Sequence, residues 1–259
     1  MDLLHYFLGG LSGVLVGFTL GLVGGGGSVL AVPLMVYLVG IKNPHVAIGT
    51  SAFAVAVNAA MGLLNHAKAG NVKWRCGGVY ATAGIVGALI GSTAGKAFNG
   101  QKLLFLFAIV MVIVGMFMLR GRRNEGVPGV ICSWEKTPKI LGFGLVTGVF
   151  SGFFGIGGGF LIVPGLIAAL GIPILEAVGT SLIAVTAFGL TTAFNYALSG
   201  LVDWRLAFVF IAGGFVGSLA GAHIARELAS KRGQLTTVFA VLVFIVAAYM
   251  LWRSFPASF

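Results

Sequence analysis

The 259-residue sequence has few charged side chains, few acids and two cysteines. Charged residues make up 8% of it, against about 25% in an ordinary soluble domain, which excludes a solvated globular surface. No polar stretch is long enough for a soluble catalytic or nucleotide-binding domain. Cys76 and Cys132 have no second Cys or His at metal-ligand spacing, so we expect two unpaired thiols and no metal site. No carboxylate lies at the middle of an apolar segment, which disfavours a cation path; the six acids are Asp2, Glu125, Glu135, Glu176, Asp203 and Glu227.

Apolar residues and glycine dominate what remains. Hydrophobic residues make up 58% of the chain, 42 residues are glycine, and the mean hydropathy is +1.06. Glycine weakens helices in water but lets helices pack closely in lipid. The sequence therefore predicts an all-α polytopic membrane protein. The net charge of +10 fits Lys and Arg in cytoplasmic loops better than a nucleic-acid partner. The start lacks the features of a cleavable signal peptide.

One unit occurs twice along the chain. The run from Gly24 to Pro33 matches the run from Gly155 to Pro164 at six of ten positions, with an offset of 131. From Ala47 onward the offset is 130, and it pairs Gly-Thr-Ser with Gly-Thr-Ser and Trp-Arg with Trp-Arg. This register predicts a tandem duplication. We expect a first membrane repeat over 1–119, a basic cytoplasmic linker over 120–139 and a second repeat over 140–259.

Each repeat contains five apolar segments. The second segment of each is too short to cross a hydrocarbon core of about 30 Å and follows a glycine run, so we expect a half-helix that forms a hairpin with the segment before it. An odd number of crossings per repeat would place 11 basic residues on one side and 5 on the other, which favours an inverted second repeat with both termini outside. The segments are 3–22, 28–40, 46–66, 77–95 and 103–119, then 138–154, 159–171, 176–197, 206–224 and 235–252.

The two glycine runs are the first candidate site. A helix that begins inside the bilayer leaves about four N–H groups without partners and presents the positive end of its dipole. Residues without side chains let an anion approach those groups. The alternative is that the glycines only permit close helix packing. The candidate anion ligands are Gly24, Gly25, Gly26, Gly27, Ser28, Gly155, Gly157, Gly158 and Gly159.

Polar residues on the third segments extend this site. Hydroxyls and amides can replace water around an anion, or can only join neighbouring helices; the candidates are Thr50, Ser51, Asn65, Thr180, Ser181 and Asn195. Arg75 and Arg205 follow the third segments, and we interpret them either as interfacial anchors or as attractors of anions at opposite mouths of a pathway. His66 and Glu176 are weak candidates for a proton carrier, with an interfacial role as the alternative. Small-residue stripes on the fourth segments fit tight helix crossing, inside the protein or in a homodimer.

The repeated glycine run leading into Val-Pro, the downstream Gly-Thr-Ser and the duplication resemble the TauE/SafE family of sulfite exporters. The resemblance covers about Gly13 to Gly221 and implies transport of sulfite or organosulfonates across the bacterial inner membrane. We expect a secondary transporter without a cofactor, whose partners are a small sulfur-containing anion and the bilayer. The alternatives are an anion channel with the same site, or a membrane-embedded enzyme or assembly factor, which the lack of a nucleophile–base pair disfavours.

Overall fold

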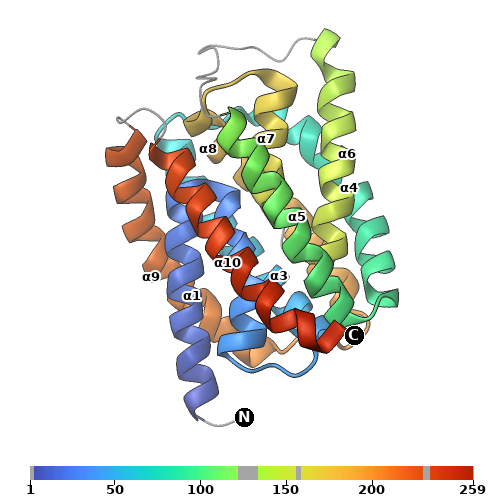
Figure 1. Ribbon diagram of the computed structural model, residues 1–259. Coiled ribbons are helices and arrows are strands. Elements are labelled where there is room, and N and C mark those ends of the chain that lie inside the picture. The colour runs from blue at the N-terminus through green and yellow to red at the C-terminus, as the bar shows by residue number, and fades with distance from the viewer. Residues whose placement is uncertain (1–2, 122–133, 156–158, 230–233, 259) are drawn as a thin grey trace.

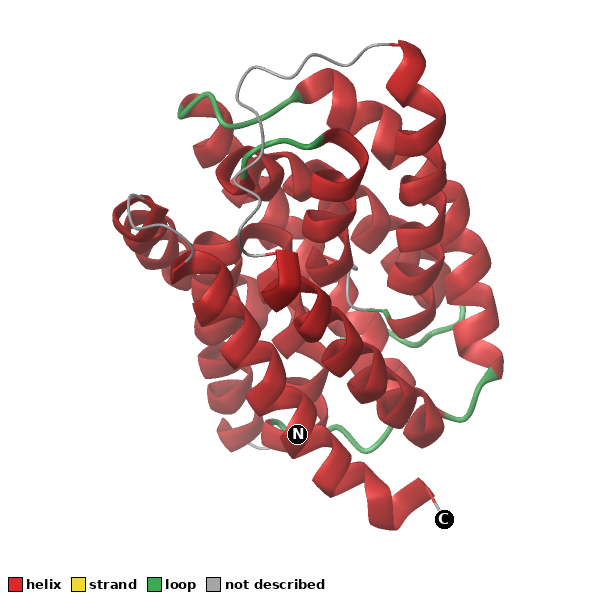
Figure 2. Cartoon of the chain, turned by 45° about the horizontal axis from the view of Figure 1, so that its top comes forward, coloured by secondary structure: helices red, strands yellow, loops and turns green. Residues whose placement is uncertain are grey.

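The described part of the chain is helical throughout. The computed structural model describes residues 3–121, 134–155, 159–229 and 234–258, and every element within these ranges is a helix (Figures 1 and 2). Six of these helices are long and apolar enough to cross a membrane. The predicted all-α polytopic membrane fold is therefore confirmed. The six are Leu4–Leu38, a continuous helical stretch that reverses at Gly24, and Pro44–Lys68, Trp74–Ala97, Thr137–Phe154, Ile174–Ala197 and Trp204–Ile224.

The helices follow the predicted segments closely. The main difference lies in the first glycine run, where we expected a helix to begin at Ser28. The run itself forms a 3₁₀ helix that starts at Gly24, because residues without side chains avoid the crowding between positions i and i+3 in that helix. The elements are α1 Leu3–Val23, η1 Gly24–Leu30, α2 Ala31–Pro33, η2 Leu34–Leu38, α3 Pro44–Lys68, α4 Trp74–Ala97 and α5 Gly100–Gly121, then η3 Trp134–Lys136, α6 Thr137–Phe154, α7 Gly159–Leu170, α8 Ile174–Ala197, α9 Trp204–Ala229 and α10 Gln234–Ser258.

A left-handed glycine ends the first long helix of each half. Gly24 follows α1 with φ +63° and Gly155 follows α6 with φ +67°, values that side-chain-bearing residues rarely adopt. The N–H of Gly155 donates to the carbonyls of Ser151 and Gly152 at 2.9 and 3.2 Å, which closes the end of α6. These glycines are the reversal points of two hairpins, α1 with η1–α2–η2 and α6 with α7.

The two halves are packed together by glycine. In α1, Gly13 and Gly17 lie directly against the backbone of Phe210 and Gly214 in α9. In α4, Gly87 and Gly91 lie in the same way against the backbone of α6. Both helix pairs run parallel, since the contacted residue number rises along each stripe. The stripes on α4 and α9 therefore serve the interior of the protein.

Helices α3 and α8 cross antiparallel at the centre. Gly62 of α3 faces Leu182, whereas Gly189 of α8 faces Ala56, so the crossing lies close to Asn58 and its counterpart Phe188. Helices α5 and α10 pack against each other beside this centre (Figure 1). The most extensive helix pairs, α1–α9, α4–α6, α3–α8 and α5–α10, thus join one half of the chain to the other.

The molecule has two ends that we name the terminal face and the linker face. Both chain termini lie at the terminal face, at the bottom of Figure 1, and α6 begins at the opposite end. We define the linker face by the end of α5, the start of α6, the α3–α4 loop and the α7–α8 loop. Lys136, just before α6, donates to the carbonyl of Leu170 in the α7–α8 region at 3.4 Å. Helices α1 and α6 begin at opposite faces.

The prediction of two unpaired thiols is wrong for Cys76. Cys76 is buried at the start of α4 and is disulfide-bonded. Cys132 lies outside the described residues. Spacing alone missed this bond, because a disulfide depends on proximity in the fold.

Candidate functional site

The tips of the two hairpins meet inside the protein. All four glycines of the first run are buried, together with Ser28 and Val29. The backbone of Gly25 lies directly against Gly159, the first residue of α7. A Cβ atom on Gly25 would lie 2.6 Å from Cγ2 of Val185 and 2.8 Å from Cα of Gly159. Only a residue without a side chain fits this contact.

Each tip also rests on the first turns of a central helix from the other half. Gly24 packs against Val178 of α8, and Gly155 packs against Ile48 of α3. Ile48 and Val178 are equivalent at the offset of 130, so the two tips make matching contacts from opposite directions. The candidate residues Gly157 and Gly158 lie outside the described residues.

Serine hydroxyls surround the first tip. The N–H of Gly25 donates to Oγ of Ser181 at 3.2 Å, and Oγ of Ser28 donates to the carbonyl of Gly25 at 2.8 Å. Ser181 donates in turn to the carbonyl of Val178 at 2.7 Å. The equivalent Ser51 of α3 makes the matching bond to Ile48 at 3.1 Å. The structure therefore brings Gly25, Ser28, Gly159 and Ser181 together.

The chemistry of these contacts is polar and uncharged. The groups at the tips are a backbone N–H and hydroxyls, which here donate to protein oxygens. Donors of this kind solvate a negative charge without a fixed cation once they are released from those bonds. Within the described residues, no group of three or more His, Cys, Asp or Glu side chains is placed to hold a metal ion.

The hydroxyls of the two candidate threonines, Thr50 and Thr180, accept hydrogen bonds from the backbone of loops. Oγ1 of Thr180 accepts the backbone N–H of Lys73 at 3.0 Å, at the linker face. Oγ1 of Thr50 accepts the backbone N–H of Asp203 at 2.9 Å, at the terminal face. Both pairs are equivalent at the offset of 130. Each bond fastens the loop after one central helix to the first turns of the other central helix.

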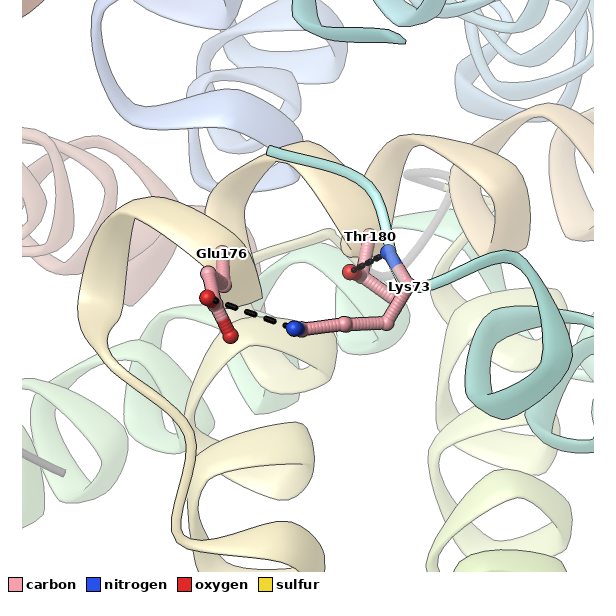
Figure 3. A network of polar contacts seen from close by, with 3 residues as sticks. All are labelled: Lys73, Glu176 and Thr180. Atoms are coloured by element: carbon pink, nitrogen blue, oxygen red, sulfur yellow. Dashed lines mark hydrogen bonds and ion pairs between the residues drawn. The ribbon is translucent and has the colours of Figure 1, made fainter. Parts of the chain in front are cut away.

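An ion pair accompanies the bond at the linker face. Nζ of Lys73 lies 3.4 Å from Oε1 of Glu176, with side-chain exposures of 29% and 20%. Figure 3 shows the lysine held twice by α8, through its backbone by Thr180 and through its side chain by Glu176. Glu176 lies in the first turn of α8, where the helix dipole favours negative charge.

The remaining candidates lie away from the tips. Asn195 is near the end of α8, where its amide oxygen accepts from Nζ of Lys96 at 2.9 Å and its amide nitrogen donates to Ser92 at 2.6 Å. Asn65 is half-buried near the end of α3. Arg75 and Arg205 are exposed and stand two residues after Lys73 and Asp203, at opposite faces.

Two features were missed from the sequence. Lys96, in the last turn of α4, donates to three oxygens at the C-terminal end of α8, including Oγ of Ser199 at 2.9 Å. Its positive charge there is favourable for the dipoles of both helices. Asn58 is 1% exposed, and both polar atoms of its amide are buried with no partner among the described residues. The sequence shows that Asn58 is polar, but only the packing shows that its amide is buried and unpartnered.

Comparison with known proteins identifies the family of the chain. The family model described as "Sulfite exporter TauE/SafE" matches residues 9–250. The chain belongs to the TauE/SafE family. No solved structure matches the chain.

The relatives of this TauE/SafE protein are named as transporters. A "Probable membrane transporter protein" of Xylella fastidiosa (strain Temecula1) is 50% identical over 250 residues, covering 95% of each chain. The "Probable membrane transporter protein YunE" of Bacillus subtilis is 24% identical over 93% of this chain and 95% of its own. The "Sulfite exporter TauE/SafE family protein 2" of Arabidopsis thaliana is 32% identical over 52% of this chain and 28% of its own. The TauE/SafE chain is therefore a member of a membrane transporter family.

Proposed function

We propose that this protein is a secondary transporter that exports small sulfur oxyanions, sulfite or organosulfonates, across the bacterial inner membrane. The anion binds between the two hairpin tips and reaches each face in turn as one half rocks against the other. The proposed ligands are the backbone of the two glycine runs and the hydroxyls of Ser51 and Ser181. The protein needs no cofactor and performs no chemistry on its cargo.

One observation carries the proposal: the backbone of Gly25 meets that of Gly159 where the two hairpins enter from opposite directions. Helix ends buried within a membrane protein and aimed at a shared point are the arrangement by which transporters hold anionic groups. Around Gly25, Val185 and Val178 fill the space beside the tip. The tips are in direct contact here, so the proposed binding of an anion requires them to separate.

The substrate class is tested by ligand-dependent stability. A ligand that binds the folded state raises its melting temperature by mass action, by about 2.7 kcal/mol of stability at a concentration of 100 Kd. We expect sulfite or a sulfonate to raise the melting temperature of the detergent-solubilised protein, and sodium chloride at equal ionic strength to leave it unchanged. A panel of sulfite, sulfate, thiosulfate, sulfoacetate and taurine in which none shifts the melting temperature would contradict the proposed cargo.

The role of the tips is tested by removing one hydroxyl. Ser181→Ala deletes the oxygen that lies against Gly25, and we expect sulfite flux to fall about tenfold, the cost of one hydrogen bond to a charged group. Thr186→Ala is the matched control, because Thr186 lies on the same helix and its hydroxyl donates to the carbonyl of Leu182, one turn earlier in α8. Initial rates of sulfite flux into proteoliposomes give the comparison. Equal losses in both variants would refute a role for Ser181 in binding.

A further inference from the structure

The two ends of the protein are closed by equivalent hydrogen bonds but by unequal charges. At the linker face, Thr180 holds the backbone of Lys73 and Glu176 holds its ammonium group (Figure 3). At the terminal face, Thr50 holds the backbone of Asp203. The two faces differ in the contacts that the side chains of Lys73 and Asp203 make.

On the terminal face no carboxylate–ammonium pair can form at the same place. The carboxylate of Asp203 accepts the N–H of Leu206 at 3.1 Å and so caps the start of α9. The position equivalent to Glu176 is Val46, which is apolar and packs against the core. The closure at the terminal face therefore has the hydrogen bond without the ion pair.

The spacing at the linker face makes the two contacts act together. Glu176 and Thr180 are four residues apart on α8, so they share one side of the helix. Lys73 is the last residue before α4, and both contacts act on this single residue. Separating the α3–α4 loop from α8 must break both at once.

We propose that Lys73 and Glu176 form an ionic lock that makes the closure of the α3–α4 loop at the linker face stronger than the equivalent closure of the α8–α9 loop at the terminal face. The inference rests on the proposed alternating access, since a lock matters only if the two faces open in turn. The closed protein then opens more readily towards the terminal face, and opening of the linker face requires the loss of the ion pair.

Amide hydrogen exchange measures the difference between the two faces directly. At each face the closing hydrogen bond is donated by one backbone N–H, that of Lys73 or that of Asp203. Exchange at the amides of Lys73 and Asp203, each relative to its intrinsic rate, reports the opening of each face in the full-length protein in nanodiscs. In Glu176→Gln, which keeps the size of the side chain, we expect exchange at Lys73 to rise about two- to fivefold, the range for a partly exposed ion pair. Exchange at Asp203 should stay unchanged.

The converse test introduces an ion pair at the terminal face. Val46→Lys places an ammonium group at the position equivalent to Glu176, on the same helix as Thr50 and one turn before it. We expect exchange at Asp203 to slow by a similar factor, with Val46→Gln as the uncharged control. An unchanged rate at Asp203 in Val46→Lys contradicts the lock.

Two results in Glu176→Gln would overturn the proposal. One is an unchanged exchange rate at Lys73, and the other is an equal rise at Asp203, which marks general loosening of the fold. The experiment uses no substrate, so its outcome is separate from that of the sulfite measurements. Failure of sulfite to bind would remove the proposed cargo and leave the unequal closure standing.

Discussion

At the residue scale, function and stability make opposite demands on buried polar groups. A buried donor or acceptor without a partner costs about 1–3 kcal/mol, so most such groups in the interior are bonded. Ser28 and Ser181 follow this rule through bonds to or from Gly25. The amide of Asn58 does not follow it, and this amide packs against Gly214 of α9. Its counterpart Phe188 packs apolar atoms against Gly84, which shows that the fold tolerates an apolar side chain at the equivalent position.

Asn58→Leu is therefore expected to stabilise the protein. Leucine has nearly the same shape as asparagine and removes two unpartnered polar atoms, so the free energy of unfolding should rise by about 1 kcal/mol. Thermal unfolding of the purified variant in detergent measures the change. A fall in melting temperature would show that the amide has a partner, such as an ordered water, that stabilises the fold.

At the element scale, glycine stripes determine which helices touch. The parallel pairs α1–α9 and α4–α6 approach until backbone meets backbone, which only glycine permits. The sequence predicted tight crossing from the spacing alone. It did not identify the partner of each stripe, because a stripe of small residues fits any complementary helix, including one on a second copy of the chain.

Substituting alanine for two glycines of α6 distinguishes the effect of close helix packing on stability from the effect of helix propensity. In Gly144→Ala the new methyl group would meet the backbone of Tyr80 in α4, and we expect a loss of stability above about 2 kcal/mol. In Gly142→Ala it would meet no atom within 4 Å, and we expect no loss, or a gain of up to about 1 kcal/mol. Unfolding of both variants by heat gives the comparison, and similar values for the two would contradict the close α4–α6 contact.

At the scale of the whole molecule, the duplicated sequence predicted much of the fold. The apolar segments and the glycine reversals follow from hydropathy and from the demand for φ > 0, both of which are local. The offset of 130 also pairs the two hydrogen bonds that hold the loops. The bond between Thr50 and Asp203 and the bond between Thr180 and Lys73 join equivalent positions. The linker at 120–139 lies mostly outside the described residues, so the repeat boundaries and the cytoplasmic placement of the linker stay predictions.

The sequence predicted the candidate site less completely than it predicted the helices. The serine hydroxyls and the glycine run were predicted as one site, and the structure brings Gly25 and Ser181 into contact. Asn195 carries the same kind of polar group, but it lies about 20 Å further along α8, because 14 residues separate it from Ser181. Residue type indicates what a side chain can bind, whereas only the fold shows which neighbours it has.

The central claim is that the hairpin tips hold a small anion that reaches the two faces in turn. Counterflow of radiolabelled sulfite in proteoliposomes tests it most directly, because an alternating carrier exchanges external for internal substrate. We predict saturable uptake that accelerates when unlabelled sulfite is present inside the vesicles and is lost in Gly25→Val. Non-saturating flux without acceleration by internal sulfite would indicate a channel and contradict the account.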